Sequence, residues 1–184
     1  MYTGKHIILT PFEKEDAVLY RTWVNTPEIM QYLDRISPVT ASDHEQWYSS
    51  LLNHPAVILF AIRYQQALIG CVWLYDIHYR HRKAEVRILI GPHEAHNKKL
   101  GLDTLLTLSD FAFAQLNLHK LYAYVLENNP RALKCFQNAG FREEGRLRAE
   151  CYQNNHYLDV IRLGRLKIEK AEEPEHLLPS SPCK

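Results

Sequence analysis

The sequence predicts one mixed α/β domain of the α+β kind, in which about four helices flank a mostly antiparallel sheet of roughly six to seven strands. Two observations carry this prediction. Short runs rich in β-branched residues, bounded by Gly, Pro or Asn, alternate with longer runs whose apolar residues are spaced for a helix. The 184 residues, 46% of them hydrophobic, suffice for one core and not comfortably for two. We expect this domain over residues 1–167 and a flexible C-terminal tail over 168–184, which is rich in Glu, Pro and Ser.

The first third of the chain is expected to hold one strand and three helices. Residues 6–10 form a short apolar run ended by a proline, which indicates a strand. Residues 13–25 place apolar side chains on one side behind an acidic first turn, as an amphipathic helix does. A short helix over 28–33 follows a proline break, and a further helix is expected from about residue 40 to 53.

The remaining elements follow from alternation, spacing and turn residues. Residues 57–63 and 67–75 are apolar runs around a short polar linker, which predicts a β-hairpin, and residues 85–90 alternate like a half-buried strand. Asn129-Pro130 and Gly140 provide the N-cap, the first-turn proline and the left-handed C-terminal residue of a helix. The later elements are expected to be a helix over 100–116, a strand over 120–126, a helix over 130–139 and two long strands over 141–152 and 156–166.

Charge and composition set several classes of partner aside. The formal net charge of +1 gives no field that would attract nucleic acid. No apolar run is long enough to cross a bilayer, and the N-terminus lacks the apolar middle of a signal peptide, so we expect a cytoplasmic protein without a membrane partner. Two histidine pairs fall in expected loops, where we expect no metal. The cysteines have no paired metal-ligand spacing and are expected to be free thiols; they are Cys71, Cys135, Cys151 and Cys183.

Several motifs occur together along the chain. They are Ala84-Glu85 before Ile88-Leu89-Ile90-Gly91, the loop into Gly101, Asn129 with Arg131-Ala132, the run from Asn138 to Arg148, and Tyr157-Leu158-Asp159-Val160. With this combination, the chain from about residue 6 to 167 resembles the GNAT superfamily of acetyltransferases. It is most similar to the branch with ribosomal-protein N-terminal acetyltransferases and amino-sugar N-acetyltransferases, and the segments 43–47 and 75–77 favour the amino-sugar enzymes.

The resemblance implies acetyl-CoA as the acetyl donor and a central strand pair that splays apart. In the family, backbone groups of the strand that ends here at Ile90 bind the pantetheine arm, and N–H groups of the following loop and helix hold the pyrophosphate. A backbone N–H freed by the splay would stabilise the thioester oxygen as it becomes negative. The residues that the resemblance places at the cofactor are Ile88, Leu89, Ile90, His96, Asn97, Lys98, Lys99, Leu100, Gly101, Leu102, Asp103, Asn129 and Phe136.

Two positions depart from the family pattern. Lys99 stands where the loop usually has a glycine, and its Cβ would cost roughly 1 kcal/mol if the backbone takes a positive φ there. Phe136 stands where many relatives carry the tyrosine that protonates the departing CoA thiolate. Tyr124 or Cys135 can be considered as substitutes for that acid. Cys135 is otherwise expected to be a small buried hydrophobe, because no histidine is placed to activate it as a nucleophile.

Glu85 is the expected general base. It would take the proton of the substrate ammonium through a water molecule, because a carboxylate on the central strand faces the cleft in parts of the family. The alternative role is an ion pair on the strand face with Arg87 or Arg142. Four aromatic residues can either line an acceptor pocket or pack in the core; they are Trp47, Tyr48, Trp73 and Tyr75. For Trp73, core packing is favoured.

These expectations combine into one function and two alternatives. We expect an acetyl-CoA-dependent N-acetyltransferase that acts by direct transfer to a primary amine of a small molecule, in the first place a nucleotide-linked amino sugar. The alternatives are N-terminal acetylation of a ribosomal or other protein, and a GNAT-like domain that binds CoA with little or no catalysis. A homodimer is compatible with the sequence, and neither a metal nor a nucleic acid is expected.

Overall fold

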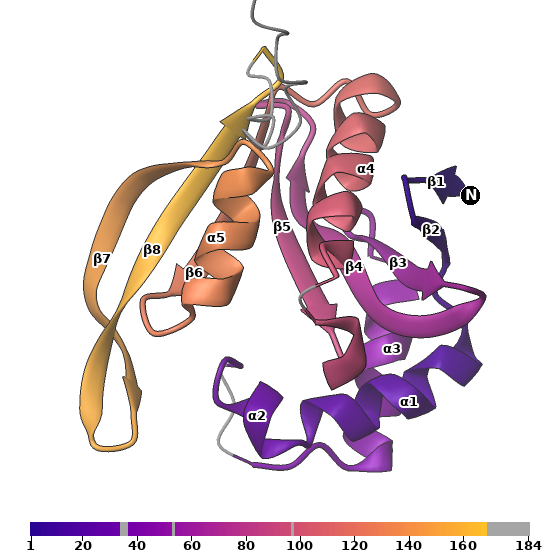
Figure 1. Ribbon diagram of the computed structural model, residues 1–184, viewed down its shortest axis with the longest axis vertical. Helices are drawn as coiled ribbons and strands as arrows, with labels where there is room; N and C mark the ends of the chain where they lie inside the picture. The colour runs from indigo at the N-terminus through magenta and orange to yellow at the C-terminus, as the bar shows by residue number, and fades with distance from the viewer. Residues whose placement is uncertain (34–36, 53, 97, 169–184) are drawn as a thin grey trace, which may run out of the picture.

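One sheet organises the whole molecule. The computed structural model describes residues 1–33, 37–52, 54–96 and 98–168. Within them, eight strands form a sheet in the order β1-β2-β3-β4-β5-β6-β8-β7 (Figure 1). The strands are β1 (Tyr2–Thr3), β2 (Ile7–Pro11), β3 (Ile58–Tyr64), β4 (Ala67–His78), β5 (Lys83–Ile90), β6 (Lys120–Leu126), β7 (Arg142–Gln153) and β8 (His156–Leu166). Neighbouring strands are antiparallel except β5 and β6, which run parallel.

Helices cover both faces of this sheet. In the described ranges the α-helices are α1 (Lys14–Val24), α2 (Pro27–Met30), α3 (Ala41–Leu52), α4 (Leu100–Ala114) and α5 (Pro130–Asn138). A short 3-10 helix, η1 (His93–Ala95), precedes α4. α4 and α5 pack on one face, and α1 and α3 pack on the other (Figure 1). No helix within the described ranges is long and apolar enough to cross a membrane.

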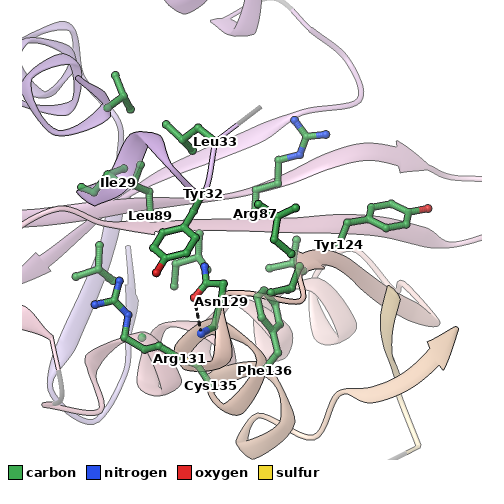
Figure 2. A pocket seen from close by; sticks show the side chains of 18 of the residues that line it. Ile29, Tyr32, Leu33, Arg87, Leu89, Tyr124, Asn129, Arg131, Cys135 and Phe136 are labelled. Carbon is green, nitrogen blue, oxygen red and sulfur yellow. Dashed lines mark hydrogen bonds between the residues drawn. The ribbon is translucent and has the colours of Figure 1, made fainter. Parts of the chain in front are cut away.

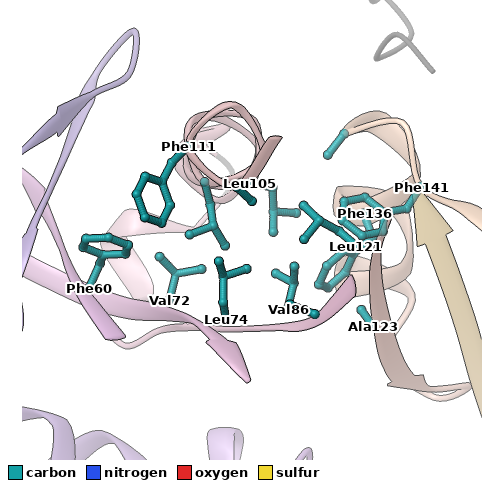
Figure 3. Close-up of a cluster of buried hydrophobic side chains, with 14 of the residues drawn as sticks. Phe60, Val72, Leu74, Val86, Leu105, Phe111, Leu121, Ala123, Phe136 and Phe141 are labelled. Carbon is teal, nitrogen blue, oxygen red and sulfur yellow. The ribbon is translucent and has the colours of Figure 1, made fainter. Parts of the chain in front are cut away.

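The larger hydrophobic core lies between the sheet and helices α4 and α5. Phe60, Val72 and Leu74 of the sheet lie opposite Leu105 and Phe111 of α4, as Figure 3 shows. Each such side chain contributes about 1.5–3 kcal/mol when it is fully removed from water. A second core lies between the other face of the sheet and α1; it includes Phe12, Ala17, Tyr20, Trp23, Val24, Ala61, Cys71 and Leu89. The two cores fix the sheet between its helical layers.

The mixed α/β architecture predicted from the sequence is confirmed, and the differences concern short elements. β1 has only two residues, too few for a sequence pattern, and it brings the sheet to eight strands. α2 ends at Met30, whereas the sequence predicted a helix over 28–33. The expected flexible tail lies, from residue 169 onward, outside the described residues.

The central strands β5 and β6 separate, as the resemblance implied. They pair only through Lys83 with Lys120, Ala84 with Leu121 and Glu85 with Tyr122. Beyond Glu85, the rest of β5 stays paired with β4 on its other side and has no pairing with β6. Backbone groups on that side of β5 are therefore left for another partner.

Helix α5 has the ends that its sequence predicted. The Asn129 side chain accepts a hydrogen bond from the backbone N–H of Ala132 at 3.1 Å, which caps the first turn. Gly140 has a φ of 84°, and the N–H of Phe141 donates to the carbonyl of Phe136 at 3.0 Å. The rings of Phe136 and Phe141 also meet edge to face, 5.0 Å apart. This pattern is a Schellman motif with its hydrophobic contact, and it fixes α5 beside the gap between β5 and β6.

Candidate functional site

A cavity of about 1330 Å³ lies where β5 and β6 separate (Figure 2). Both strands line it, together with the start of α4 and the length of α5 from one face of the sheet and residues of α1, α2 and α3 from the other. Elements that are far apart in the sequence therefore meet at one concave surface, which makes the cavity the candidate functional site.

Most of the residues that the sequence placed at the site line this cavity. Those predicted to bind the cofactor are Ile88, Leu89, Ile90, His96, Lys99, Leu100, Gly101, Leu102, Asn129 and Phe136. The three residues predicted as catalytic also line it; they are Glu85, Tyr124 and Cys135.

Of the remaining three predicted cofactor residues, Lys98 and Asp103 do not line the cavity, and one lies outside the described residues. Lys98 is exposed, and its Nζ lies 5.8 Å from the centre of the Tyr64 ring. The carboxylate of Asp103 accepts hydrogen bonds from three backbone N–H groups of residues 5–7, at 2.8, 2.6 and 3.1 Å. Asp103 therefore ties the N-terminal segment to α4, and it does not line the cavity. Asn97 lies outside the described residues.

The wall that α4 and α5 contribute is positively charged. We call it the cationic side; it comprises Lys99, Leu100, Gly101, Leu102, Arg131 and Lys134. The first N–H groups of α4 have no partner within the helix, and the helix dipole adds partial positive charge there. This side therefore suits phosphate groups.

Lys99, the N-cap of α4, has the backbone conformation expected from the family loop. Its φ is 59° and its ψ is 13°, which is the left-handed region. A glycine would adopt this conformation without strain, whereas the Cβ of lysine opposes it. The side chain forms no capping hydrogen bond with the helix. Lys99 thus adds a positive charge to the loop at the cost of backbone strain.

Cys135 and Tyr124 lie on different elements and face different surroundings. Burial raises the pKa of the Cys135 thiol to about 11, although the charge of Arg131 opposes the shift. A Cβ placed on Gly101 would lie 3.2 Å from the Cys135 sulfur, so this thiol faces the first turn of α4. Tyr124 is 42% exposed, and Figure 2 shows its ring directed away from Phe136 and Cys135.

Glu85 forms a two-point ion pair with Arg87 on the same face of β5. Arg87 Nε lies 2.6 Å from Oε1 and Nη2 lies 3.0 Å from Oε2 of the carboxylate. The guanidinium also lies over the ring of Tyr75, 4.0 Å from its centre. Burial acts to lower the pKa of Arg87, but the hydrogen bonds and charge of Glu85 outweigh it and raise the pKa. Of the two ion-pair partners expected from the sequence, the structure has Arg87.

The opposite wall, which is formed by α1, α2 and the turn after it, α3, and one residue of β4, is largely aromatic and aliphatic. We call it the aromatic side; it comprises Tyr20, Ile29, Tyr32, Leu33, Trp47 and Trp73. The rings of Tyr20 and Trp47 stack, with their centres 5.0 Å apart and an angle of 5° between their planes. Figure 2 shows Ile29, Tyr32 and Leu33 reaching into the cavity from the side opposite α5. Among the described lining residues, Glu85 is the one carboxylate.

Two of the four aromatic residues considered for an acceptor pocket line the cavity, and the other two do not. Trp47 and Trp73 line the cavity, and both also pack against the second core. Tyr48 instead donates a hydrogen bond to the carbonyl of Phe12 at 3.3 Å, and Tyr75 lies beneath Arg87. The latter two are supporting residues.

Several lining residues were not predicted from the sequence. Arg131 and Lys134 are three apart on α5, and this spacing places both charges on one helix face, which is a signal that the sequence offers. Tyr32 and Leu33 follow α2 in a turn without periodicity, so no pattern indicates that they line a cavity.

The comparisons with known proteins agree with one another. A family model described as an acetyltransferase (GNAT) domain matches residues 6–142. Spermidine N(1)-acetyltransferase from Vibrio cholerae is 34% identical over 162 residues, which cover 87% of this chain and 92% of that protein. The crystal structure of spermidine N-acetyltransferase from Vibrio cholerae in complex with CoA and spermine has a TM-score of 0.81 at 32% identity, covering 89% of this chain and 96% of that one. A dodecameric structure of the Vibrio cholerae enzyme has a TM-score of 0.74 at 30% identity, covering 89% and 95%.

Proposed function

The chain belongs to the GNAT acetyltransferase family and is an acetyl-CoA-dependent N-acetyltransferase, and from this premise we propose that its acceptor is a polyamine-like alkylamine. The observation that carries the proposal is the contrast between the two sides of one cavity. The cationic side suits phosphates, the aromatic side suits an alkylammonium chain, and they meet where β5 leaves β6.

The chain's own groups form a cradle that fits acetyl-CoA. The unpaired side of β5 between Val86 and Ile90 offers backbone N–H and carbonyl groups to the amides of a pantetheine arm. Lys99, Arg131 and the first N–H groups of α4 would hold the phosphates. The bound group supplies the acetyl thioester. A backbone N–H of β5 at the splay would then stabilise the negative charge that develops on the thioester oxygen. In other enzymes, removal of one such donor lowers kcat about a hundredfold or more.

The aromatic side supports an alkylamine as the acceptor. An ammonium group close to the rings of Trp47 and Trp73 gains a cation–π interaction, and methylene groups can pack on Ile29 and Leu33. A nucleotide-linked amino sugar would bring a pyrophosphate to this side. Among the described residues that line the cavity outside the cationic side, the one Lys or Arg is Arg87, and Glu85 already binds its Nε and Nη2. The named relatives likewise favour a polyamine over the amino sugar that the sequence suggested.

Proton transfer is proposed to involve Glu85 and no dedicated acid. Glu85 would accept the ammonium proton of the acceptor through a water molecule, while Arg87 keeps the carboxylate fixed. Phe136 cannot return a proton to the leaving sulfur. Because a thiol has a pKa of about 8.5, a thiolate leaves without much assistance, and the reaction proceeds at a reduced rate.

An acceptor panel tests this proposal. Release of free thiol from acetyl-CoA would be measured with putrescine, spermidine, spermine, nucleotide-linked amino sugars, and peptides that start with alanine or serine. We expect the highest kcat/KM with a polyamine. Turnover on amino sugars or peptides alone would contradict the polyamine acceptor, while the acetyltransferase activity would stand. A thermal shift with CoA and no turnover on any class would support the alternative of a binding domain; a ligand at a hundred times its Kd stabilises by about 2.7 kcal/mol.

Two variants separate the acceptor side from its supporting residues. Trp47→Leu removes a ring that lines the cavity, and loss of a cation–π interaction is expected to raise KM for spermidine roughly three- to thirtyfold. Tyr48→Phe is the matched control, because Tyr48 lies one position away and does not line the cavity. Neither change should alter the Kd of CoA. An equal effect of both variants on KM would contradict the acceptor position.

Self-association is proposed from the same relatives. One matched Vibrio cholerae structure is described as dodecameric, and the sequence is compatible with a homodimer. We expect a homo-oligomer, and light scattering after size-exclusion chromatography measures its mass directly. A monomer at micromolar concentration would contradict this expectation.

A further inference from the structure

We infer that His96 is a positioning residue, whose neutral imidazole joins the end of β5 to Arg131 and aims the Arg131 guanidinium at the phosphates of acetyl-CoA. The inference rests on the proposed function, since it assigns the cationic side of the cavity to the cofactor. Within that function it names a residue that acts through another.

The two ring nitrogens of His96 contact groups of opposite character. Nε2 lies 3.2 Å from the carbonyl oxygen of Ile90, and Nδ1 lies 2.8 Å from Nη1 of Arg131. A guanidinium can only donate hydrogen bonds, so Nδ1 must be the unprotonated nitrogen. A carbonyl can only accept, so Nε2 must carry the hydrogen. Both contacts therefore require the same neutral tautomer of His96.

This bridge joins two elements that form the cavity. Ile90 is the last residue of β5, and Arg131 is in the first turn of α5. All three residues of the bridge line the cavity. A change in the ionisation of His96 therefore acts directly on the orientation of the Arg131 guanidinium.

The position of Arg131 itself indicates an anionic ligand. A positive side chain in the first turn of a helix is disfavoured by the helix dipole, and the first turn of α5 contains no acidic residue that would compensate. Lys99 and Lys134 line the same side of the cavity and add like charge. A bound phosphate would offset all of these repulsions together.

The charged groups around His96 favour its neutral form. Burial lowers the pKa of His96, and the charges of Arg131 on α5 and of His93 on η1 lower it further, while the Ile90 carbonyl and Glu94 oppose the shift. Protonation would remove the acceptor for Arg131 and place two positive charges next to each other. The guanidinium would then lose its fixed direction, so cofactor binding is expected to weaken at acid pH.

Direct binding of CoA, measured by calorimetry without an acceptor, tests the inference independently of turnover. His96→Ala and Arg131→Gln are each expected to raise the Kd of CoA about tenfold, which corresponds to one charge-assisted hydrogen bond. The double variant should have the same Kd for CoA as the single variant that binds more weakly, because both changes disable the same contact. Values of kcat at saturating acetyl-CoA should stay within about twofold.

The pH dependence and a matched control complete the test. Between pH 5 and 8, the ratio of the Kd values of His96→Ala and wild type should rise with pH, because only the wild type gains from a neutral His96. His93→Gln is the control, since the His93 ring centre lies 5.4 Å from that of His96 and His93 does not line the cavity; at pH 8 its Kd should equal that of the wild type. His96→Gln keeps one donor and one acceptor, so it should restore part of the affinity and guard against misfolding of the alanine variant. An unchanged Kd in His96→Ala, or additive effects of His96→Ala and Arg131→Gln, would overturn the inference.

Discussion

Arg87 holds both carboxylate oxygens of Glu85, with Nε 2.6 Å from one oxygen and Nη2 3.0 Å from the other. The Glu85 side chain is 12% exposed and lies where β5 and β6 begin to separate. In the proposed function, the pair therefore fixes the carboxylate at the splay, where the acceptor amine would meet the thioester. A fixed carboxylate of this kind can orient an ammonium and accept its proton through water.

Glu85→Gln is expected to lower kcat/KM for the amine about a hundredfold, because the amide keeps the shape of the side chain but cannot accept a proton. The Kd of CoA should not change. Steady-state kinetics with saturating acetyl-CoA measures the effect, and Glu143→Gln on the exposed strand β7 is the control for the loss of one carboxylate. If Glu85→Gln keeps the kcat/KM of the wild type, Glu85 serves only as the partner of Arg87.

Phe136→Tyr is expected to raise kcat about tenfold by supplying a phenol hydroxyl that can protonate the leaving thiolate. Phe136 lines the cavity, so a hydroxyl on its ring can reach the cofactor space while the ring keeps its contact with Phe141. A pH profile of kcat should then gain a descending limb at alkaline pH, as the new phenol ionises. Phe136→Leu is the comparison that removes the ring without adding a hydroxyl. An unchanged kcat with both substitutions would place the thioester away from Phe136.

The elements of the fold could largely be predicted because their signals are local. The cap at Asn129, the left-handed Gly140 and the alternation in β5 depend only on neighbouring residues, and all three are present. β1 could not be predicted, because two residues pair with β2 only through the tertiary structure. The splay of β5 from β6 followed from family resemblance, since no residue pattern encodes where a parallel pair stops.

The site could be predicted in part, and the remainder depends on contacts between distant segments. The sequence offered Arg87 and Arg142 as partners of Glu85; Arg87, two residues away, lies on the same strand face, whereas the position of Arg142 depends on how β7 joins the sheet. Asp103 looked like a loop residue near the cofactor, yet its carboxylate binds the backbone of residues 5–7, almost a hundred positions away. Tyr32 and Leu33 reach the cavity from a turn that no periodicity marks.

Two substitutions of Lys99 distinguish the effect of its backbone strain from the effect of its charge. Lys99→Gly relieves the left-handed φ of 59° and is expected to stabilise the fold by about 1 kcal/mol, or roughly 2–4 °C in Tm. Lys99→Ala keeps the strain and should not raise Tm. Both variants lose the positive charge, so both should bind CoA more weakly at low salt, with the difference from wild type shrinking as salt rises. Calorimetric melting and titration at two salt concentrations measure both effects. A Tm that rises equally in the two variants would contradict the strain.

Cys135 is expected to contribute packing rather than chemistry. Burial raises the pKa of its thiol to about 11, so at pH 8 roughly one molecule in a thousand carries the thiolate that a nucleophile needs. Cys135→Ser should therefore keep kcat within about threefold. Intact-protein mass spectrometry after mixing wild type with acetyl-CoA should show no covalent acetyl group, and Cys151→Ser, at the other cysteine that lines the cavity, is the control. An acetylated wild type that loses the label only in Cys135→Ser would instead establish a covalent route through this thiol.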